Sequence, residues 1–123
     1  MQKKVACIGN ALVDKVCMLQ SDNLLCEQNL PKGSMQLIDE KESKRLQAFT
    51  QELKSTLATG GSAANTASGT ANMGIETTYI GMVGDDELGD FYIQDMHQHS
   101  ISTCIFRNAD MQTGLALGLV SPD

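Results

Sequence analysis

The chain has 123 residues, of which 41% are hydrophobic and 20% charged, and its formal net charge at pH 7 is −6. That length fits one domain with its own core, and that composition is typical of a globular protein. An acidic balance without a stripe of Lys and Arg argues against nucleic acid as a partner. The apolar runs are too short to cross a bilayer, so we expect no membrane partner either.

The N-terminal residues and the cysteines bear on the compartment. No long apolar stretch with a small-residue cleavage site follows Met1, so we expect a cytoplasmic protein. The four cysteines form no Cys-x-x-Cys pair and have no His at metal-ligand spacing. We interpret them as reduced thiols and expect no metal site in this chain.

Strands separated by a polar loop are predicted in the first third of the chain. A continuous apolar run that ends at Gly9 is typical of a buried central strand. Pro31 and Gly33 lie in a polar stretch and indicate a loop. The predicted strands cover residues 5–8, 12–20 and 33–38, and the loop covers residues 21–34.

Helices and strands alternate in the rest of the chain. Asp39 and Asp86 can each cap a helix whose apolar residues recur at intervals of three and four. The predicted helices cover about residues 40–55, 62–73 and a segment after Asp86, and the strands cover residues 57–59, 77–83, 103–106 and 113–120. Alternation of this kind predicts an α/β fold with a mainly parallel sheet. The last two strands have no helix between them, which indicates an antiparallel hairpin or an appended sheet.

The segment at residues 58–65, Ala-Thr-Gly-Gly-Ser-Ala-Ala-Asn, is the most informative motif. Gly60 and Gly61 allow backbone to approach a ligand closely where a strand turns into a helix, and the helix start offers N–H donors. Ser62 and Asn65 are spaced to face the same pocket. A strand–helix junction without a ligand also explains the glycines. The dinucleotide pattern G-x-G-x-x-G is missing from the motif, and no P-loop sequence exists in the chain.

The glycine spacing continues downstream with Gly74 and Gly84. From Gly60 to Gly84 the pattern resembles the first signature of the PfkB/ribokinase family of carbohydrate and nucleoside kinases. The resemblance implies a ribokinase-like three-layer α/β fold with a small β-sheet lid that closes over the substrate and excludes water. It also implies a homodimer that packs through the lid strands. The implied lid strands lie near residues 12–20, 33–38, 103–107 and 113–120.

Residues 9–14, Gly-Asn-Ala-Leu-Val-Asp, look like the family's first strand and its Gly-Asn…Asp element. Asp14 can accept two hydroxyl hydrogens, and Asn10 can both donate and accept, which suits a sugar diol. A turn aspartate beside a helix-cap asparagine is the alternative interpretation. Gln36 lies in a segment similar to one with which adenosine-kinase-like members contact the substrate. The resemblance implies a substrate site formed by Asn10, Asp14, Gln36, Gly60, Gly61, Ser62 and Asn65.

Part of the family's machinery has no counterpart in this sequence. Members carry a later signature, Gly-Ala-Gly-Asp, that supplies an anion hole and the catalytic base, and nothing here matches it. We therefore expect an N-terminal portion with no catalytic residue, with the ATP and Mg²⁺ sites largely outside it, and inactive alone. The intact protein is expected to transfer the γ-phosphoryl group of ATP to a primary hydroxyl of a sugar or nucleoside. The Gln36 segment and Gly-Asn-x-Leu-x-Asp favour adenosine.

Two other classes of function stay open at this point. The chain could be a non-catalytic sugar- or nucleoside-binding module, or a dimerising lid module. It could also be an unrelated Rossmann-like binding domain, which titration with NAD and with nucleosides would separate from the first two. His97 and His99 are interpreted as solvated helix residues, and Asp85 with Asp86 as a turn and a helix cap.

Overall fold

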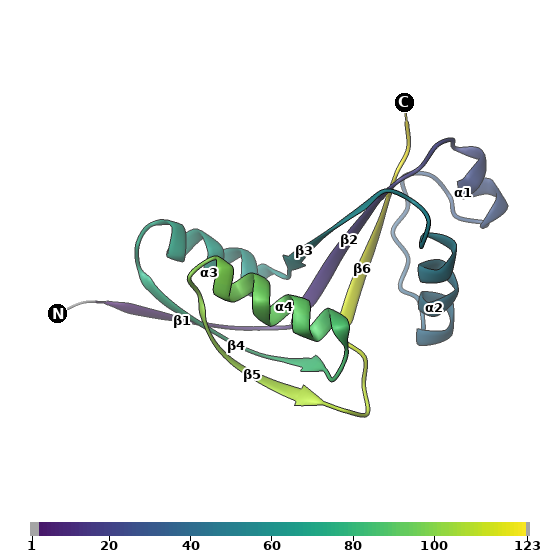
Figure 1. Ribbon diagram of the computed structural model, residues 1–123. Helices are drawn as coiled ribbons and strands as arrows, with labels where there is room; N and C mark the ends of the chain where they lie inside the picture. Colours follow the sequence, from purple (N-terminus) through teal and green to yellow (C-terminus); the bar gives the residue numbers. More distant parts are fainter. Residues whose placement is uncertain (1–2, 123) are drawn as a thin grey trace. The chain divides into compact units, whose positions relative to one another are not determined.

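The computed structural model describes residues 3–122 and divides into two compact units. The first unit comprises residues 3–15 and 57–116, and the second comprises residues 16–56 and 117–122. In chain order the elements are β1 Lys4–Ile8, β2 Leu12–Met18, α1 Asn23–Glu27, α2 Glu40–Phe49, β3 Ser55–Gly60, α3 Ser62–Asn72, β4 Glu76–Gly84, α4 Glu87–Gln98, β5 Ser102–Asn108 and β6 Gly114–Val120 (Figure 1).

A parallel sheet with the strand order β1-β4-β5 forms the centre of the first unit. Ile8 of β1 lies opposite Ile80 of β4, and Gly84 at the end of β4 lies opposite Asn108 of β5. Helices α3 and α4 pack on the same face of this sheet (Figure 1). The predicted α/β fold with a mainly parallel sheet is confirmed.

The core of the first unit lies between this sheet and its two helices. Small side chains on α3 allow the helix to approach the strands closely, while α4 contributes larger groups. The buried residues of the core are Cys7, Ala11, Val13, Ala64, Ala67, Tyr79, Val83, Tyr92, Met96 and Ile101. The apolar spacing that predicted α4 is therefore the spacing of its buried face.

Apolar side chains also lie on the other face of the β1-β4-β5 sheet. Ile8 is 75% exposed, and Met82 and Phe106, which are direct partners across β4 and β5, are 55% and 59% exposed. Strands of parallel sheets are usually covered on both faces, which gives them continuous apolar runs. The strand predicted at residues 5–8 is present, but β1 lies at an edge of the described sheet and not at its centre, and Cys7 is its one buried residue.

The other sheet has the order β3-β2-β6. Its β2 and β6 correspond to the lid strands predicted at residues 12–20 and 113–120. Residues 103–107 were wrongly assigned to this sheet, because they lie in β5 and pair in parallel with β4. Helix α4 provides the crossover connection that the parallel strands β4 and β5 need. Strand β6 lies in the other sheet, so β5 and β6 form no hairpin. The third strand of the β3-β2-β6 sheet is β3.

The strand predicted at residues 33–38 is also wrong, because the structure has neither helix nor strand there. Met35 and Leu37 are 98% and 104% exposed, so their alternation faces no core. A period of two specifies a strand only where a neighbouring strand and a buried face are present. The predicted loop at residues 21–34 contains the short α1, and α2 ends at Phe49 rather than near residue 55.

The predicted capping residues Asp39, Asp86 and Gly74 are confirmed. Asp39 accepts a hydrogen bond from the backbone N of Glu42 at 2.8 Å, and Asp86 accepts one from Gly89 N at 2.8 Å. Gly74 follows α3 with φ of +77°, a conformation that favours glycine. No helix within residues 3–122 combines the length and the apolar character that a membrane crossing requires.

Candidate functional site

The candidate site lies in the first unit, around the turn that joins β3 to α3. Gly60 is the last residue of β3, and Gly61 is the N-cap of α3 with φ of +98°. Residues with a Cβ atom rarely adopt that backbone angle. The second glycine is therefore required by the turn itself.

Each of the two glycines is also required by a neighbouring segment. A Cβ atom at residue 60 would lie 2.6 Å from Cγ of Asp14, so the absence of a side chain lets the Asp14 carboxylate pack against the turn. A Cβ atom at residue 61 would lie 2.6 Å from the backbone O of Asn10. The structure thus brings together four of the residues predicted from the sequence.

Ser62 and Asn65 lie in the first turn of α3, and both are exposed. The backbone N of Asn65 donates to Gly61 O at 3.0 Å, as in a regular helix. Within the described residues no side chain caps this helix, and its first turn contains no acidic residue. The first N–H groups and the positive end of the helix dipole are thus available beside the Asp14 carboxylate.

The polar side chains of this site have no protein partner within residues 3–122. Asn10, Asp14, Ser62 and Asn65 make no side-chain hydrogen bond or ion pair there. Asp14 is half-buried. Asn10 therefore does not cap a helix, which removes the alternative interpretation of that residue. A carboxylate, two amides and a hydroxyl can together bind the hydroxyl groups of a polar ligand.

Gln36 lies in the second unit, in the segment at residues 33–38 that forms no strand. Its side chain is exposed. Its role in substrate recognition stays a prediction.

One carboxylate that binds the residue before the turn was not predicted from the sequence. Asp95 of α4 accepts hydrogen bonds from the hydroxyl of Thr59 and, at 3.4 Å, from its backbone N. Thr59 directly precedes the two glycines. The available signal was an acidic residue beside Met96 on the apolar side of α4, where a charge needs a partner.

A second network surrounds Asp86 at the start of α4. Its carboxylate accepts hydrogen bonds from Thr113 N at 2.8 Å and from the Thr113 hydroxyl at 2.6 Å, in addition to the one from Gly89. Burial raises the pKa of Asp86, but the hydrogen bonds from Thr113 and Gly89 and the charge of Arg107 outweigh it and hold the pKa below its usual value. Asp86 is a capping residue, as the sequence predicted.

The histidines and acidic residues do not combine into a metal site in the part of the chain that the structure describes. No group of three His, Cys, Asp or Glu side chains there could hold a metal ion. His97 Nε2 lies 2.8 Å from the Thr103 hydroxyl, and His99 Nδ1 lies 2.8 Å from Asp95 O. The described residues therefore form no Mg²⁺ site.

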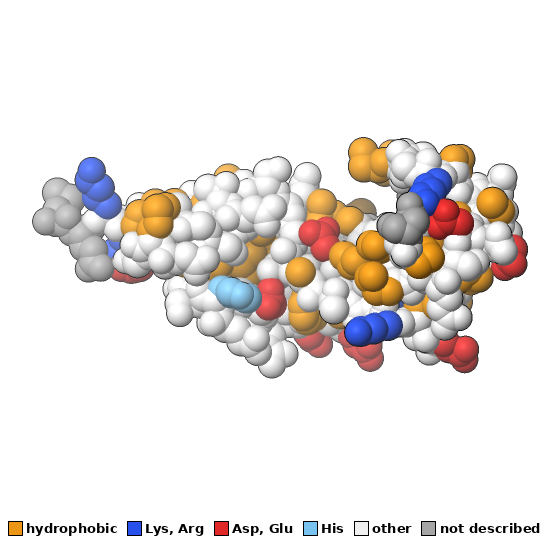
Figure 2. All heavy atoms as spheres, turned by 90° about the horizontal axis from the view of Figure 1, so that it is seen from above, with side chains coloured by type: hydrophobic (Ala, Val, Ile, Leu, Met, Phe, Trp, Pro, Cys, Tyr) orange, Lys and Arg blue, Asp and Glu red, His pale blue; other side chains and the backbone are white. Residues whose placement is uncertain are grey.

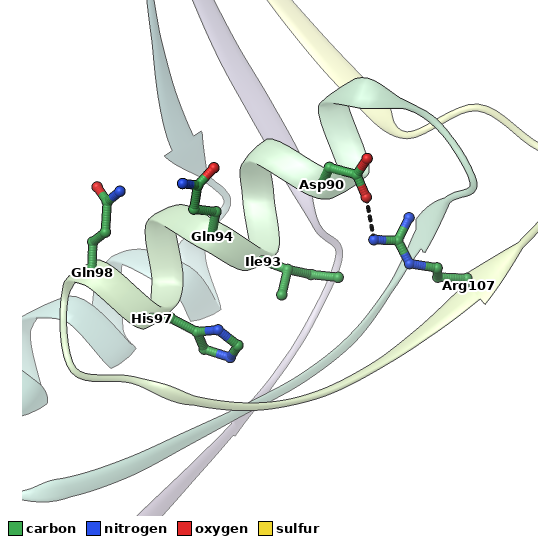
Figure 3. A pocket seen from close by; sticks show the side chains of 6 residues that line it. All are labelled: Asp90, Ile93, Gln94, His97, Gln98 and Arg107. Carbon is green, nitrogen blue, oxygen red and sulfur yellow. Dashed lines mark hydrogen bonds and ion pairs between the residues drawn. The ribbon is translucent and has the colours of Figure 1, made fainter.

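A shallow hollow lies on the outer side of α4 (Figure 3). Arg107 of β5 reaches across it to form an ion pair with Asp90. The other lining residues are Ile93, Gln94, His97 and Gln98. They occupy a different stripe of α4 from the buried Tyr92 and Met96, so the hollow is separate from the candidate site. On the face in Figure 2 the basic side chains are isolated from one another.

Comparison with known proteins places these features in a family. The sequence pattern of the pfkB family carbohydrate kinases matches residues 33–123. The 5-dehydro-2-deoxygluconokinase 2 of Bacillus cereus is 43% identical over 60 residues, which are 46% of this chain and 18% of that protein.

Two solved structures are similar to almost the whole chain. A probable sugar kinase from Rhizobium etli CFN 42 is 30% identical with a TM-score of 0.78, over 98% of this chain and 36% of that one. The adenosine kinase from Sinorhizobium meliloti is 30% identical with a TM-score of 0.76, over 100% of this chain and 37% of that one. The chain thus spans little more than a third of these structures. On the match over residues 33–123, the chain belongs to the pfkB family of carbohydrate kinases.

Proposed function

We propose that this chain is the acceptor-binding portion of an ATP-dependent kinase that phosphorylates a primary hydroxyl of a sugar or nucleoside. The observation that carries the proposal is the Asp14 carboxylate packed against Gly60, with Asn10 against Gly61 and with no protein partner for either polar side chain within residues 3–122. Family membership supports phosphoryl transfer as the reaction of the intact protein.

In this reaction the acceptor oxygen bonds to the γ-phosphorus of ATP, the bond to ADP breaks, and the hydroxyl proton leaves. ATP supplies the phosphoryl group, and we expect its Mg²⁺ to be held by residues outside this chain. The residues of this chain bind and orient the acceptor: Asp14 accepts hydrogen bonds from hydroxyls, and the amides of Asn10 and Asn65 donate and accept. Such positioning accounts for much of catalysis in phosphoryl transfer. The base is proposed to lie outside this chain.

Adenosine is the acceptor that we favour. The segment Gly-Asn-x-Leu-x-Asp at residues 9–14 and Gln36 support it, as does the 30% identity to an adenosine kinase. The 43% identity to a 5-dehydro-2-deoxygluconokinase supports 5-dehydro-2-deoxygluconate as a second candidate. That compound carries a carboxylate, which would suit the uncapped N-terminus of α3.

A thermal-shift panel on the protein at its full natural length tests the proposal. The panel contains adenosine, ribose, fructose, 2-keto-3-deoxygluconate, 5-dehydro-2-deoxygluconate and NAD. A ligand that binds the folded state raises the melting temperature as ln(1 + [L]/Kd) rises. We expect adenosine to give the largest shift. A shift with NAD alone would support a Rossmann-like binding domain instead, and no shift with any sugar or nucleoside would refute the acceptor site.

We also propose that the 123-residue chain alone transfers no phosphate, and that the intact protein is a cytoplasmic homodimer joined through lid strands β2, β3 and β6. Exposed strand edges otherwise favour uncontrolled association, which a dimer prevents. ATP-dependent phosphorylation of adenosine by the purified chain would contradict the first statement. A monomer in sedimentation equilibrium of the full-length protein would contradict the second.

A further inference from the structure

Two fully buried tyrosines lie side by side in the core of the first unit. Tyr79 of β4 and Tyr92 of α4 are both 0% exposed, and their ring centroids are 5.7 Å apart with the planes inclined by 52°. A buried phenol hydroxyl needs a hydrogen-bond partner, because the interior offers no water to replace it. The groups that accept these two hydrogen bonds therefore show which backbone segments the tyrosine pair fixes in position.

Each hydroxyl donates to a backbone carbonyl of the candidate site. Tyr79 Oη donates to Gly9 O at 3.0 Å, and Gly9 directly precedes Asn10. Tyr92 Oη donates to Gly60 O at 3.3 Å, at the residue against which the Asp14 carboxylate packs. One aromatic pair thus holds the two backbone segments that carry the predicted acceptor-binding groups.

Glycines at positions 9 and 81 allow the groups around the pair to pack closely. A Cβ atom at Gly9 would lie 2.7 Å from Cβ of Ala63 in α3. A Cβ atom at Gly81 would lie 2.7 Å from Cε1 of Tyr79 and 3.2 Å from Gly9 O. The glycine at position 81 therefore makes space for the Tyr79 ring to reach the carbonyl of Gly9.

The Tyr92 hydroxyl stays protonated and able to donate. Burial raises its pKa, and the neighbouring Tyr79 and the negative charge of Asp14 raise the pKa further.

We propose that Tyr79 and Tyr92 are positioning residues of the acceptor site. Their hydrogen bonds set the segment of Gly9 and Asn10 relative to the turn at Gly60, so that Asn10 and Asp14 meet the same acceptor molecule. Neither ring touches the acceptor in this proposal, which rests on the proposed kinase function.

The test uses Tyr79→Phe, Tyr92→Phe and the double variant in the protein at its full natural length. Each change removes one hydroxyl and keeps the ring. Without ligand, amide hydrogen exchange should quicken at residues 9–14 in Y79F and at residues 59–63 in Y92F, but not in α2. The Kd for adenosine, or for 5-dehydro-2-deoxygluconate if the wild type binds only that, should rise about tenfold per variant, as expected for one lost hydrogen bond.

Thr77→Val is the matched control. The Thr77 side chain is also buried in β4, but its hydroxyl bonds to Ile75 O and lies 2.9 Å from that of Thr70, away from both segments. T77V should lower the melting temperature without changing the acceptor Kd or the exchange at residues 9–14 and 59–63.

The outcomes separate this proposal from the proposed function. If the wild type binds an acceptor and the Phe variants bind it equally well, the positioning role is refuted while the kinase function stands. If the wild type binds none of the panel, the kinase function fails. Unchanged exchange at both segments in the Phe variants refutes the positioning role in either case.

Discussion

At the scale of single residues, the candidate site depends on two glycines, Gly60 and Gly61, which have no side chain. Gly60 and Gly61 leave space that Asp14 and the Asn10 backbone fill, and Gly61 also has a φ of +98°. The polar groups can therefore approach the start of α3 only while both positions lack a Cβ atom. Substitution of one glycine tests this directly.

Gly60→Ala should weaken acceptor binding more than it weakens folding, because the new methyl group would displace the Asp14 carboxylate. Gly69→Ala in α3 is the control, since a Cβ atom there meets nothing within 4 Å. G69A should stabilise the protein by up to about 1 kcal/mol through helix propensity. Urea unfolding and calorimetric titration measure the two effects, and a G60A protein that binds like the wild type would contradict the packing argument.

Asp86 should make stability dependent on pH in the acid range. Its pKa is lowered in the folded state, so its contribution is fully present above the unfolded value of about 3.9 and is lost as pH falls through the folded pKa. The stability difference between wild type and Asp86→Asn, measured by urea unfolding, should therefore shrink as pH falls below about 4. A carbon NMR titration that places the Asp86 carboxyl at or above about 3.9 would contradict the expected direction.

At the scale of elements, Thr113 joins three of them. Its hydroxyl donates to Asp86 at the start of α4 and accepts from Gly84 N at the end of β4 at 2.9 Å. Thr113 itself directly precedes β6 and is 5% exposed. The point at which β6 begins is thus fixed by buried hydrogen bonds rather than by a hairpin turn.

Thr113→Val should lower the free energy of unfolding by about 1–3 kcal/mol, because it leaves Gly84 N without a partner and removes one donor to Asp86. Thr56→Val in β3 is the control, because that side chain is exposed and its hydroxyl makes no hydrogen bond within residues 3–122. Urea unfolding of both variants measures the difference. Equal stability of T113V and T56V would show that the network contributes nothing.

At the scale of the whole molecule, features that depend on neighbours in sequence could be predicted. The caps at Asp39 and Asp86 and the turn at Gly61 follow from residue types within one helical turn. The place of β5 could not be predicted in this way, because parallel pairing with β4 is set by the packing of α4. The strand predicted at residues 33–38 fails for a similar reason. Met35 and Leu37 are exposed, and alternation of apolar and polar residues forms a strand only where a partner strand is present.

The residues of the candidate site also differ in whether they could be identified from the sequence. Asn10, Asp14 and the two glycines belong to short motifs and could be identified from sequence. Tyr79 and Tyr92 could not, because their hydroxyls bond to carbonyls 70 and 32 residues away. In the sequence they look like ordinary aromatic residues on the apolar face of a strand or helix. Only the structure shows that their hydroxyls bond to the carbonyls of Gly9 and Gly60.

Calorimetric titration of adenosine, or of whichever panel compound gives the largest thermal shift, into wild type and Asp14→Asn tests the central claim most directly. The protein is used at its full natural length, with Asp110→Asn in the exposed turn after β5 as the control. Hydrogen bonds to a charged group are each worth about 1.5–3 kcal/mol, so the Kd should rise at least about tenfold in D14N and stay unchanged in D110N. An unchanged Kd in D14N would contradict an acceptor site built on Asp14 and the double-glycine turn.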